Sequence, residues 1–458
     1  MNTKDTPTRP RSSLLLRSFR KHYPSAVRGE GVYLWDAAGQ RYLDFASSAV
    51  VNLIGHGVGE VGDAMAEQVK ALEFVHSSQF VTQVAERFAG ELLDFLGPGY
   101  RDAAVFFTSG GSEAVESALK LARQYQVETG NHSRTDVFSR RQSYHGATMG
   151  AMAVSGNLKR KDIYRPMLRE FTQVSTPYCY RCAYGCSNCA DQYADELDRA
   201  LAAHPGQVAA FIYEPVSGAT LGAAAPPEGY LQRVHEICTR HGVLTIADEV
   251  MTGMGRTGRA LAVEHWGVTP DIVVLAKGLS SGYAPLGAVV AGRKIVDAIA
   301  NGSGALVHGF TYNMHPTSVA TGAAVLKVIR GRKLVQAADD ERSGPAAHLK
   351  KALVRLSECA SVGDVRGMGM MWGVEFVKDR AAKTPFDPDL NFAGRVGQAC
   401  MDRGVMLYPM QGCVDGYRGD HVMVAPPAVI TEQEIDRAVE TMAEAVREVE
   451  ASPLVLGR

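Results

Sequence analysis

The sequence lacks the two features that would direct a chain into or across a membrane. No hydrophobic run approaches the roughly 18 residues of a membrane-spanning helix. The run Leu14-Leu15-Leu16 follows a polar N-terminus and is too short for the core of a signal peptide. We therefore expect a cytoplasmic protein with no membrane partner.

A surplus of charge of one sign is also missing. Lys and Arg together number 48 and Asp and Glu number 49, so the formal net charge is −1. A protein that binds nucleic acid neutralises phosphates with Lys and Arg and usually carries a clear positive surplus. The charge balance therefore predicts no nucleic-acid partner.

Internal repeats, coiled-coil heptads and long low-complexity tracts are absent too. The 458 residues leave room for two or three structural units, and the 46% hydrophobic content is ordinary for a globular protein. We expect a disordered N-terminal tail at 1–11 and an N-terminal segment at 12–80 that joins a small domain. We expect a large domain at 81–335 and the rest of the small domain at 336–458.

Short apolar runs rich in Val and Ile alternate with helical patterns in the middle of the chain. The runs cover residues 103–107, 208–213, 243–247, 272–276 and 287–291. Unbroken runs of this length are typical of strands that are buried on both faces. Helical spacing at i, i+3, i+4 and i+7 follows Ser112 and recurs over 231–238. The alternation predicts an α/β fold with a mostly parallel sheet covered by helices.

The two ends of the chain have different patterns. Residues 33–44 predict a β-hairpin that turns near Ala38-Gly39. From about residue 340 onward, helical patterns with shorter strand candidates at 374–377 and 421–425 predict an α+β domain.

Polar residues directly follow several of the predicted strands. They are Gly110-Gly111-Ser112, Glu214, Asp248 and Lys277. Ligands of parallel α/β sheets bind outside the carboxyl ends of the strands, so we expect these residues to converge.

Each of these residues has an ordinary structural interpretation when taken alone. The Gly110-Gly111 pair can form a tight turn, Asp248 can cap a helix, and Lys277 can extend to solvent. Together they form a different pattern: an anion-binding helix start, a carboxylate for a pyridinium nitrogen and an amine for a Schiff base. Pyridoxal phosphate requires these three groups.

The residues around this set resemble a known family. The stretches 248–258 and 271–278 look like the signature of class III aminotransferases, which are pyridoxal-phosphate enzymes of fold type I. Other blocks of the family follow in the same order. They are residues 42–45, 109–114, 143–146, 214–216, 308–312, 364–369 and 425–427. The resemblance covers residues 25–450 and implies a large domain with a mostly parallel sheet between helices, plus a smaller α+β domain.

The resemblance implies a role for each residue at the cofactor ring. Lys277 would form the internal aldimine, and Asp248 would pair with the pyridine nitrogen. Tyr144 would stack on one face of the ring, and Val250 would pack on the other. The family reaction moves an amino group from an amine or amino acid to a 2-oxo acid, such as pyruvate or 2-oxoglutarate, by a ping-pong mechanism.

The resemblance also places residues at the cofactor phosphate and between subunits. Gly111 and Ser112 would hold the phosphate. Thr311 would reach the phosphate of a neighbouring subunit, which implies a homodimer with shared active sites. Glu214 matches an acid beside the cofactor that pairs with a substrate-binding arginine in relatives.

The substrate side of the site departs from the family pattern. Relatives carry that arginine three residues before a Gly-Asp pair, and here Gly416 stands at this position before Gly419-Asp420. Either Arg418 serves through a shifted loop or the arginine is missing. Further candidates near the substrate, each of which could equally be a packing residue, are Trp35, Val50, Val51, Phe80 and Tyr283.

Four of the eight cysteines lie close together. They are Cys179, Cys182, Cys186 and Cys189. Zinc or an iron–sulfur cluster is conceivable, but the CxxC pairs of a zinc ribbon are normally separated by about 12 to 20 residues. We expect a metal-free loop with free or disulfide-paired thiols. The remaining cysteines, expected to be small buried residues, are Cys238, Cys359, Cys400 and Cys413.

Two other functions stay open. The first is another pyridoxal-phosphate reaction on the same scaffold, by an amino-acid epimerase, a decarboxylase or a phospho-lyase. These enzymes need Lys277 and Asp248 as well, so the two residues do not discriminate. The second is a binding module without catalysis, which has no need of a set that stabilises a carbanion.

Overall fold

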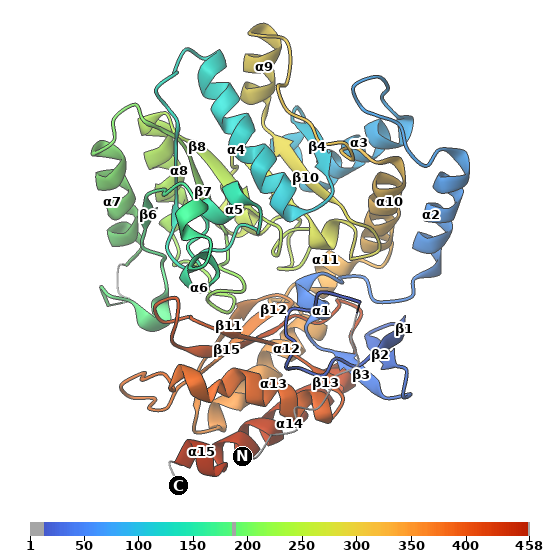
Figure 1. Ribbon diagram of the computed structural model, residues 1–458, viewed down its shortest axis with the longest axis vertical. Helices are drawn as coiled ribbons and strands as arrows, with labels where there is room; N and C mark the ends of the chain where they lie inside the picture. The colour runs from blue at the N-terminus through green and yellow to red at the C-terminus, as the bar shows by residue number, and fades with distance from the viewer. Residues whose placement is uncertain (1–12, 186–188, 457–458) are drawn as a thin grey trace, which may run out of the picture.

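The computed structural model describes residues 13–185 and 189–456, so the expected tail at 1–11 lies outside the described residues. The chain forms an upper body around a large sheet and a lower body that contains two small sheets (Figure 1). In this part of the chain, no helix is both long and apolar enough to cross a membrane.

The large sheet has seven strands, and all but one of them run in the same direction. Strand β10 is antiparallel to both of its neighbours, and the other pairings are parallel. The predicted α/β class with a mostly parallel sheet is confirmed. The order across the sheet is β4 (Ala104–Thr108), β10 (Gly287–Ala291), β9 (Ile272–Leu275), β8 (Leu244–Asp248), β7 (Val208–Tyr213), β5 (Asp136–Arg140) and β6 (Gln173–Val174).

Both faces of this sheet are covered by helices. Strand β7 shows why its sequence is apolar throughout: Phe211 and Tyr213 belong to the core on one face, and Ala210 and Ile212 to the core on the other. The first face packs against α3 (Gln83–Leu96), α7 (Cys189–Ala202), α8 (Tyr230–His241) and α10 (Pro316–Gly331). The second face packs against α4 (Gly111–Glu128), α5 (Met149–Val154) and α9 (Arg293–Asn301).

The lower body is built from the C-terminal part of the chain. Its main sheet is antiparallel and has the order β11 (Val362–Met368), β12 (Met371–Phe376), β15 (Asp420–Val424) and β14 (Tyr408–Gln411). Helices α12 (Pro345–Val354), α13 (Phe392–Asp402) and α14 (Glu432–Glu450) share its core. The predicted α+β character of this region is confirmed.

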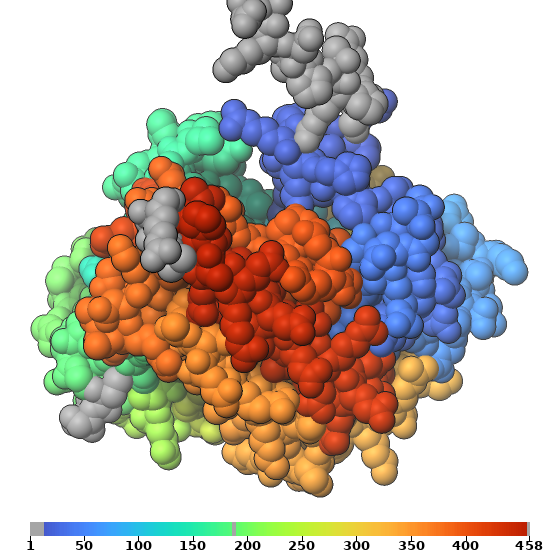
Figure 2. Space-filling model, turned by 90° about the horizontal axis from the view of Figure 1, so that it is seen from below, coloured from blue at the N-terminus to red at the C-terminus, as the bar shows by residue number. Residues whose placement is uncertain are grey.

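The N-terminal segment contributes a second small sheet to the lower body. Strands β2 (Tyr33–Asp36) and β3 (Arg41–Asp44) form the predicted hairpin, with Gly39 at φ +84° in the turn. Strand β1 (Ala26–Glu30) pairs with β2, and β3 pairs in parallel with β13 (Val405–Met406). Segments from both ends of the chain therefore lie side by side, and Figure 2 shows them on one face.

The same segment then crosses to the upper body. After α1 (Ser47–Val50), the backbone N–H groups of Leu53 and Ile54 both donate to the hydroxyl of Ser281. Helix α2 (Gly59–Ala71) then lies against α10. The segment thus packs on both bodies, and its assignment to the small domain stays a prediction.

Candidate active site

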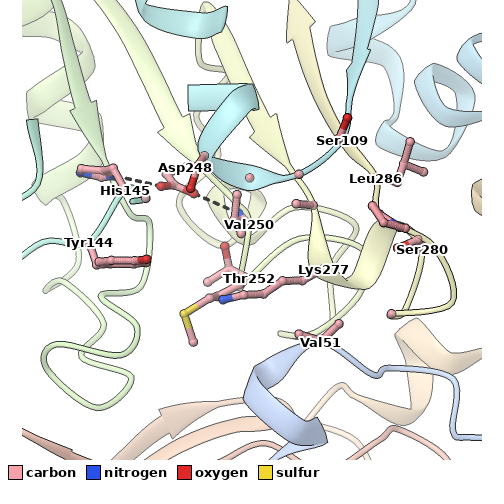
Figure 3. A pocket seen from close by; sticks show the side chains of 18 of the residues that line it. Val51, Ser109, Tyr144, His145, Asp248, Val250, Thr252, Lys277, Ser280 and Leu286 are labelled. Atoms are coloured by element: carbon pink, nitrogen blue, oxygen red, sulfur yellow. Dashed lines mark hydrogen bonds and ion pairs between the residues drawn. The ribbon is translucent and has the colours of Figure 1, made fainter. Parts of the chain in front are cut away.

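A cavity of about 310 Å³ lies at the carboxyl ends of the large sheet, as the topology predicts (Figure 3). Its walls include the loops after β4, β7, β8 and β9. Val51, which follows α1, closes it from the side of the lower body, and Figure 3 shows this residue beneath Lys277. All four polar groups singled out after the strands meet here.

Lys277 comes two residues after the end of β9 and takes a left-handed backbone conformation, with φ +45°. This conformation is unusual for a residue other than glycine and is found mostly where the surroundings enforce it. Burial in the cavity lowers the pKa of the Lys277 ammonium to about 8, although the carboxylates of Asp248 and Glu214 oppose this effect. A larger fraction of this amine than of an ordinary lysine is therefore neutral and nucleophilic near neutral pH.

Asp248 is the last residue of β8, and its carboxylate is buried and held by two donors. The Val250 backbone N–H donates to Oδ1 over 3.1 Å, and the Nδ1 of His145 lies 2.8 Å from Oδ2. Because an ionised carboxylate only accepts hydrogen bonds, Nδ1 of His145 carries the proton. The pair fixes a negative charge at the cavity wall.

The loop after β4 leads into the N-terminus of α4, where backbone N–H groups and the helix dipole favour an anion. A Cβ atom at Gly111 would lie 3.2 Å from both Cγ atoms of Val250 and 3.5 Å from the Cβ of Ala276. Because glycine has no Cβ atom, the backbone at position 111 can lie closer to Val250 and Ala276 than that of any other residue could. The hydroxyl of Ser112 also lines the cavity and accepts a hydrogen bond from the Ala147 N–H over 3.0 Å.

Tyr144 and Glu214 form the wall next to β7. The backbone N–H of Tyr144 donates to Oε2 of Glu214 over 3.2 Å, and Gly218 N–H donates to Oε1 over 3.0 Å. Burial raises the pKa of the Glu214 carboxyl above its ordinary value. The guanidinium of Arg160, on the short helix α6 (Leu158–Lys161), lies 4.7 Å from the ring centroid of Tyr144.

Of the further substrate candidates from the sequence, only Val51 lines the cavity of the described chain. Val51 lines the cavity, whereas Val50 is buried in the core beside it. Trp35 packs beneath the Arg28 guanidinium, 3.8 Å from the ring centroid, and Phe80 is 63% exposed. Tyr283 holds the N-terminal segment, since its hydroxyl donates to Gly55 O and accepts from the Val58 N–H.

Arg418 and Thr311 also lie outside the cavity wall of this chain. Arg418 is exposed and pairs with Asp415, with Nε 2.7 Å from Oδ2. Thr311 is exposed in a segment whose side chains include the exposed Val307 and Tyr312. The roles given to Trp35, Arg418 and Thr311 remain predictions.

Sequence reasoning missed His145, which lines the cavity, and Arg160, which lies over the ring of Tyr144. His145 follows Tyr144 in one of the family blocks, but only the fold shows that it meets Asp248. Arg160 had no sequence signal, because it lies on a short polar helix without a recognisable motif.

Of the four clustered cysteines, Cys179, Cys182 and Cys189 do not line this cavity, and Cys189 begins α7. Burial, followed by the proximity of Cys179 and Cys182, raises the pKa of the Cys189 thiol to about 12. Cys186 lies outside the described residues, and the absence of a metal stays a prediction. The other cysteines, namely Cys238, Cys359, Cys400 and Cys413, are buried among hydrophobic residues as predicted.

Comparison with solved structures identifies the class of protein. A transaminase from the marine bacterium Virgibacillus superposes with a TM-score of 0.87 at 34% identity, covering 96% of each chain. The omega transaminase from Pseudomonas jessenii in complex with PMP superposes with a TM-score of 0.86 at 30% identity, covering 93% of each chain. The fold is thus the fold type I of transaminases, and the protein is an enzyme of this class.

Sequence comparison then gives the family. Residues 18–446 match the family described as "Aminotransferase class-III". The uncharacterized aminotransferase YodT of Bacillus subtilis is 38% identical over 96% of this chain and 98% of its own length. An omega-aminotransferase of Caulobacter vibrioides is 32% identical over 95% and 96%. The chain belongs to the class III aminotransferase family.

Proposed function

We propose that this enzyme uses pyridoxal phosphate to move an amino group from an amine or amino acid to a 2-oxo acid by a ping-pong mechanism. The observation that carries the proposal is the pair Lys277 and Asp248. An amine with a pKa of about 8 and a buried carboxylate stand at the ends of neighbouring strands and line one cavity.

The residues present fit this cofactor. Gly111 and the start of α4 offer backbone N–H groups to the phosphate dianion, and a Cβ atom at Gly111 would press on Val250 in the cavity wall. Asp248 is kept in place by His145 and suits a protonated ring nitrogen. Tyr144 and Val250, both in the cavity wall, supply apolar surfaces for a flat ring.

When bound, the cofactor would supply an aldehyde for the amino group and a ring that accepts electrons. Asp248 would hold the positive charge at the ring nitrogen through a preorganised electrostatic contact. Lys277 would hold the cofactor covalently and, when its amine is free, would take up at Nζ the proton that leaves the substrate carbon and give it back. Val51 and the wall from the N-terminal segment would exclude water from that proton.

We further propose that the working unit is a homodimer in which Thr311 contacts the phosphate bound to the partner subunit. Exposed apolar side chains in the segment around Thr311 and in the loop before α3 support an interface. They include Phe80, Val81, Val307 and Tyr312. We also expect a cytoplasmic location.

The alternative functions on this scaffold are separated by one spectral experiment. The purified holoenzyme is given an amine donor without an oxo acid, and the absorbance of the cofactor is followed. A transaminase stops at the pyridoxamine form and recovers when pyruvate or 2-oxoglutarate is added. An epimerase, decarboxylase or phospho-lyase returns to the starting spectrum without an acceptor, and this outcome would refute the proposal.

A further inference from the structure

We propose that Arg160 is the residue that binds the carboxylate of the oxo acid acceptor and of amino acid donors. This inference rests on the proposed function, and it assigns carboxylate recognition to α6 rather than to the C-terminal loop that holds Arg418.

Arg160 stands beside the reacting groups. Its guanidinium lies 4.7 Å from the ring centroid of Tyr144, which lines the cavity. Its positive charge is close enough to Lys277 to contribute to the lowered pKa of that amine. A carboxylate bound by Arg160 would therefore lie next to Tyr144, a residue of the cavity wall.

Arg256 is the other cation that lowers the pKa of Lys277, and its N–H groups are already used in hydrogen bonds to the protein. Arg256 is buried, and its guanidinium donates to the backbone carbonyls of Pro426 over 2.6 Å and Asn52 over 3.2 Å. The guanidinium of Arg160 is exposed and, among the described residues, donates to no carboxylate or carbonyl. Of the two cations, only Arg160 can offer its N–H groups to a substrate.

The surroundings of Arg160 favour an anion. A second cavity of about 460 Å³ borders it between α6, α13 and β14, and Lys21 and Lys159 line this cavity as well. The other described lining residues are uncharged. A cavity lined by cations and by no carboxylate attracts anions.

The loop that carries the carboxylate-binding arginine in relatives is closed to this role here. A Cβ atom at Gly416, where φ is +93°, would lie 3.2 Å from three side-chain carbons of Leu158, so the loop packs directly on α6. Arg418 is tied to Asp415 by both its side chain and its backbone N–H. Arg160, whose guanidinium lies over the ring of Tyr144, is thus on the helix against which this loop packs.

The test compares substrates that differ only in the carboxylate. Pyruvate and acetaldehyde are used as acceptors with wild type, Arg160→Met and Arg160→Lys. A hydrogen bond to a charged group contributes enough that its loss weakens binding about ten- to a hundredfold. We expect Arg160→Met to raise the KM for pyruvate by this factor, with kcat and the KM for acetaldehyde within about twofold of wild type. Arg160→Lys retains a charge without the planar fork and should be intermediate.

A second measurement does not depend on turnover. Calorimetric titration with propanoate, which carries a carboxylate but no reacting carbonyl, should show the same ten- to hundredfold loss of affinity in Arg160→Met. Arg165→Met is the matched control, since Arg165 is an exposed arginine five residues on that lines neither cavity, and it should bind like wild type.

Three outcomes would overturn the inference. They are unchanged propanoate affinity in Arg160→Met, equal losses for pyruvate and acetaldehyde, or a selective loss in Arg418→Met instead. A wild-type enzyme that aminates no oxo acid but binds propanoate through Arg160 would refute the proposed function while leaving the carboxylate site standing.

Discussion

His145 donates a hydrogen bond from Nδ1 to Oδ2 of Asp248 over 2.8 Å, although the two residues are 103 positions apart in the chain. Both side chains are buried, and Nε2 of His145 has no hydrogen-bond partner among the described residues. The imidazole therefore positions the carboxylate, while Oδ1 is held by the Val250 N–H. The two hydrogen bonds therefore fix the orientation of the Asp248 carboxylate before any ligand binds.

Replacing Asp248 tests this charge. We expect Asp248→Asn to keep its fold and to bind pyridoxal phosphate, because asparagine has nearly the same volume. Turnover should fall by about 10² to 10³, the typical loss when a preorganised electrostatic partner is removed. Single-turnover absorbance measurements with an amine donor check the rate. Near-normal turnover in a folded Asp248→Asn enzyme would contradict the assignment.

Replacing Lys277 tests the covalent attachment of the cofactor. Lys277→Ala should bind pyridoxal phosphate through the phosphate and ring contacts but should lack the visible absorbance of the lysine-bound form and show no turnover. Lys161→Ala on α6 is the control, since among the described residues Nζ of Lys161 donates only to the carbonyls of Ala153 and Ser155. If Lys277→Ala retained the wild-type spectrum and activity, another lysine would have to serve.

The lowered pKa of Lys277 predicts how cofactor attachment depends on pH. The ammonium form cannot attack an aldehyde, so the rate of attachment to the apoenzyme should rise with pH and level off above about 8. Asp248→Asn removes a carboxylate that raises the pKa of Lys277, so the midpoint of the pH profile of attachment should move below pH 8. Stopped-flow absorbance after mixing apoenzyme with pyridoxal phosphate from pH 6 to 10 measures the pH profile of the wild type and of Asp248→Asn. A rate that is flat with pH, or a midpoint near that of an ordinary lysine, would contradict this prediction.

The shared active site is tested by mixing two inactive or weakened chains. Thr311→Ala should weaken cofactor retention about ten- to a hundredfold, since one charge-assisted donor to the phosphate is lost. Lys277→Ala and Thr311→Val chains are then refolded together. If the loop acts across the interface, both lesions fall on one site of the heterodimer and the other site is intact. Recovered activity supports the crossing loop, and a fully active monomer at high dilution would exclude it.

The sequence predicted the large sheet and the convergence at its carboxyl edge well, because buried parallel strands need continuous apolar runs and ligand sites follow their ends. The run 208–213 matches β7, and Lys277 and Asp248 do line one cavity. Strand β6 has only two residues and left no such signal.

Contacts between distant segments could not be predicted in the same way. The pairing of β3 with β13 and the contact of His145 with Asp248 depend on how the chain folds back, which local periodicity does not encode. Arg160 was missed for the same reason, since its position opposite Tyr144 follows from the placement of α6 rather than from its sequence.

The Ser281 hydroxyl, which accepts from the N–H groups of Leu53 and Ile54, has a mechanical consequence. Ser281 follows Lys277 by four residues, and Val51 precedes Leu53 by two. One side-chain oxygen thus couples the cavity wall to the loop that carries the reactive amine, so a displacement of the N-terminal segment would move both together. The gap between Val51 and the amine is therefore set by this local linkage, and the enzyme would select substrates by size at this wall.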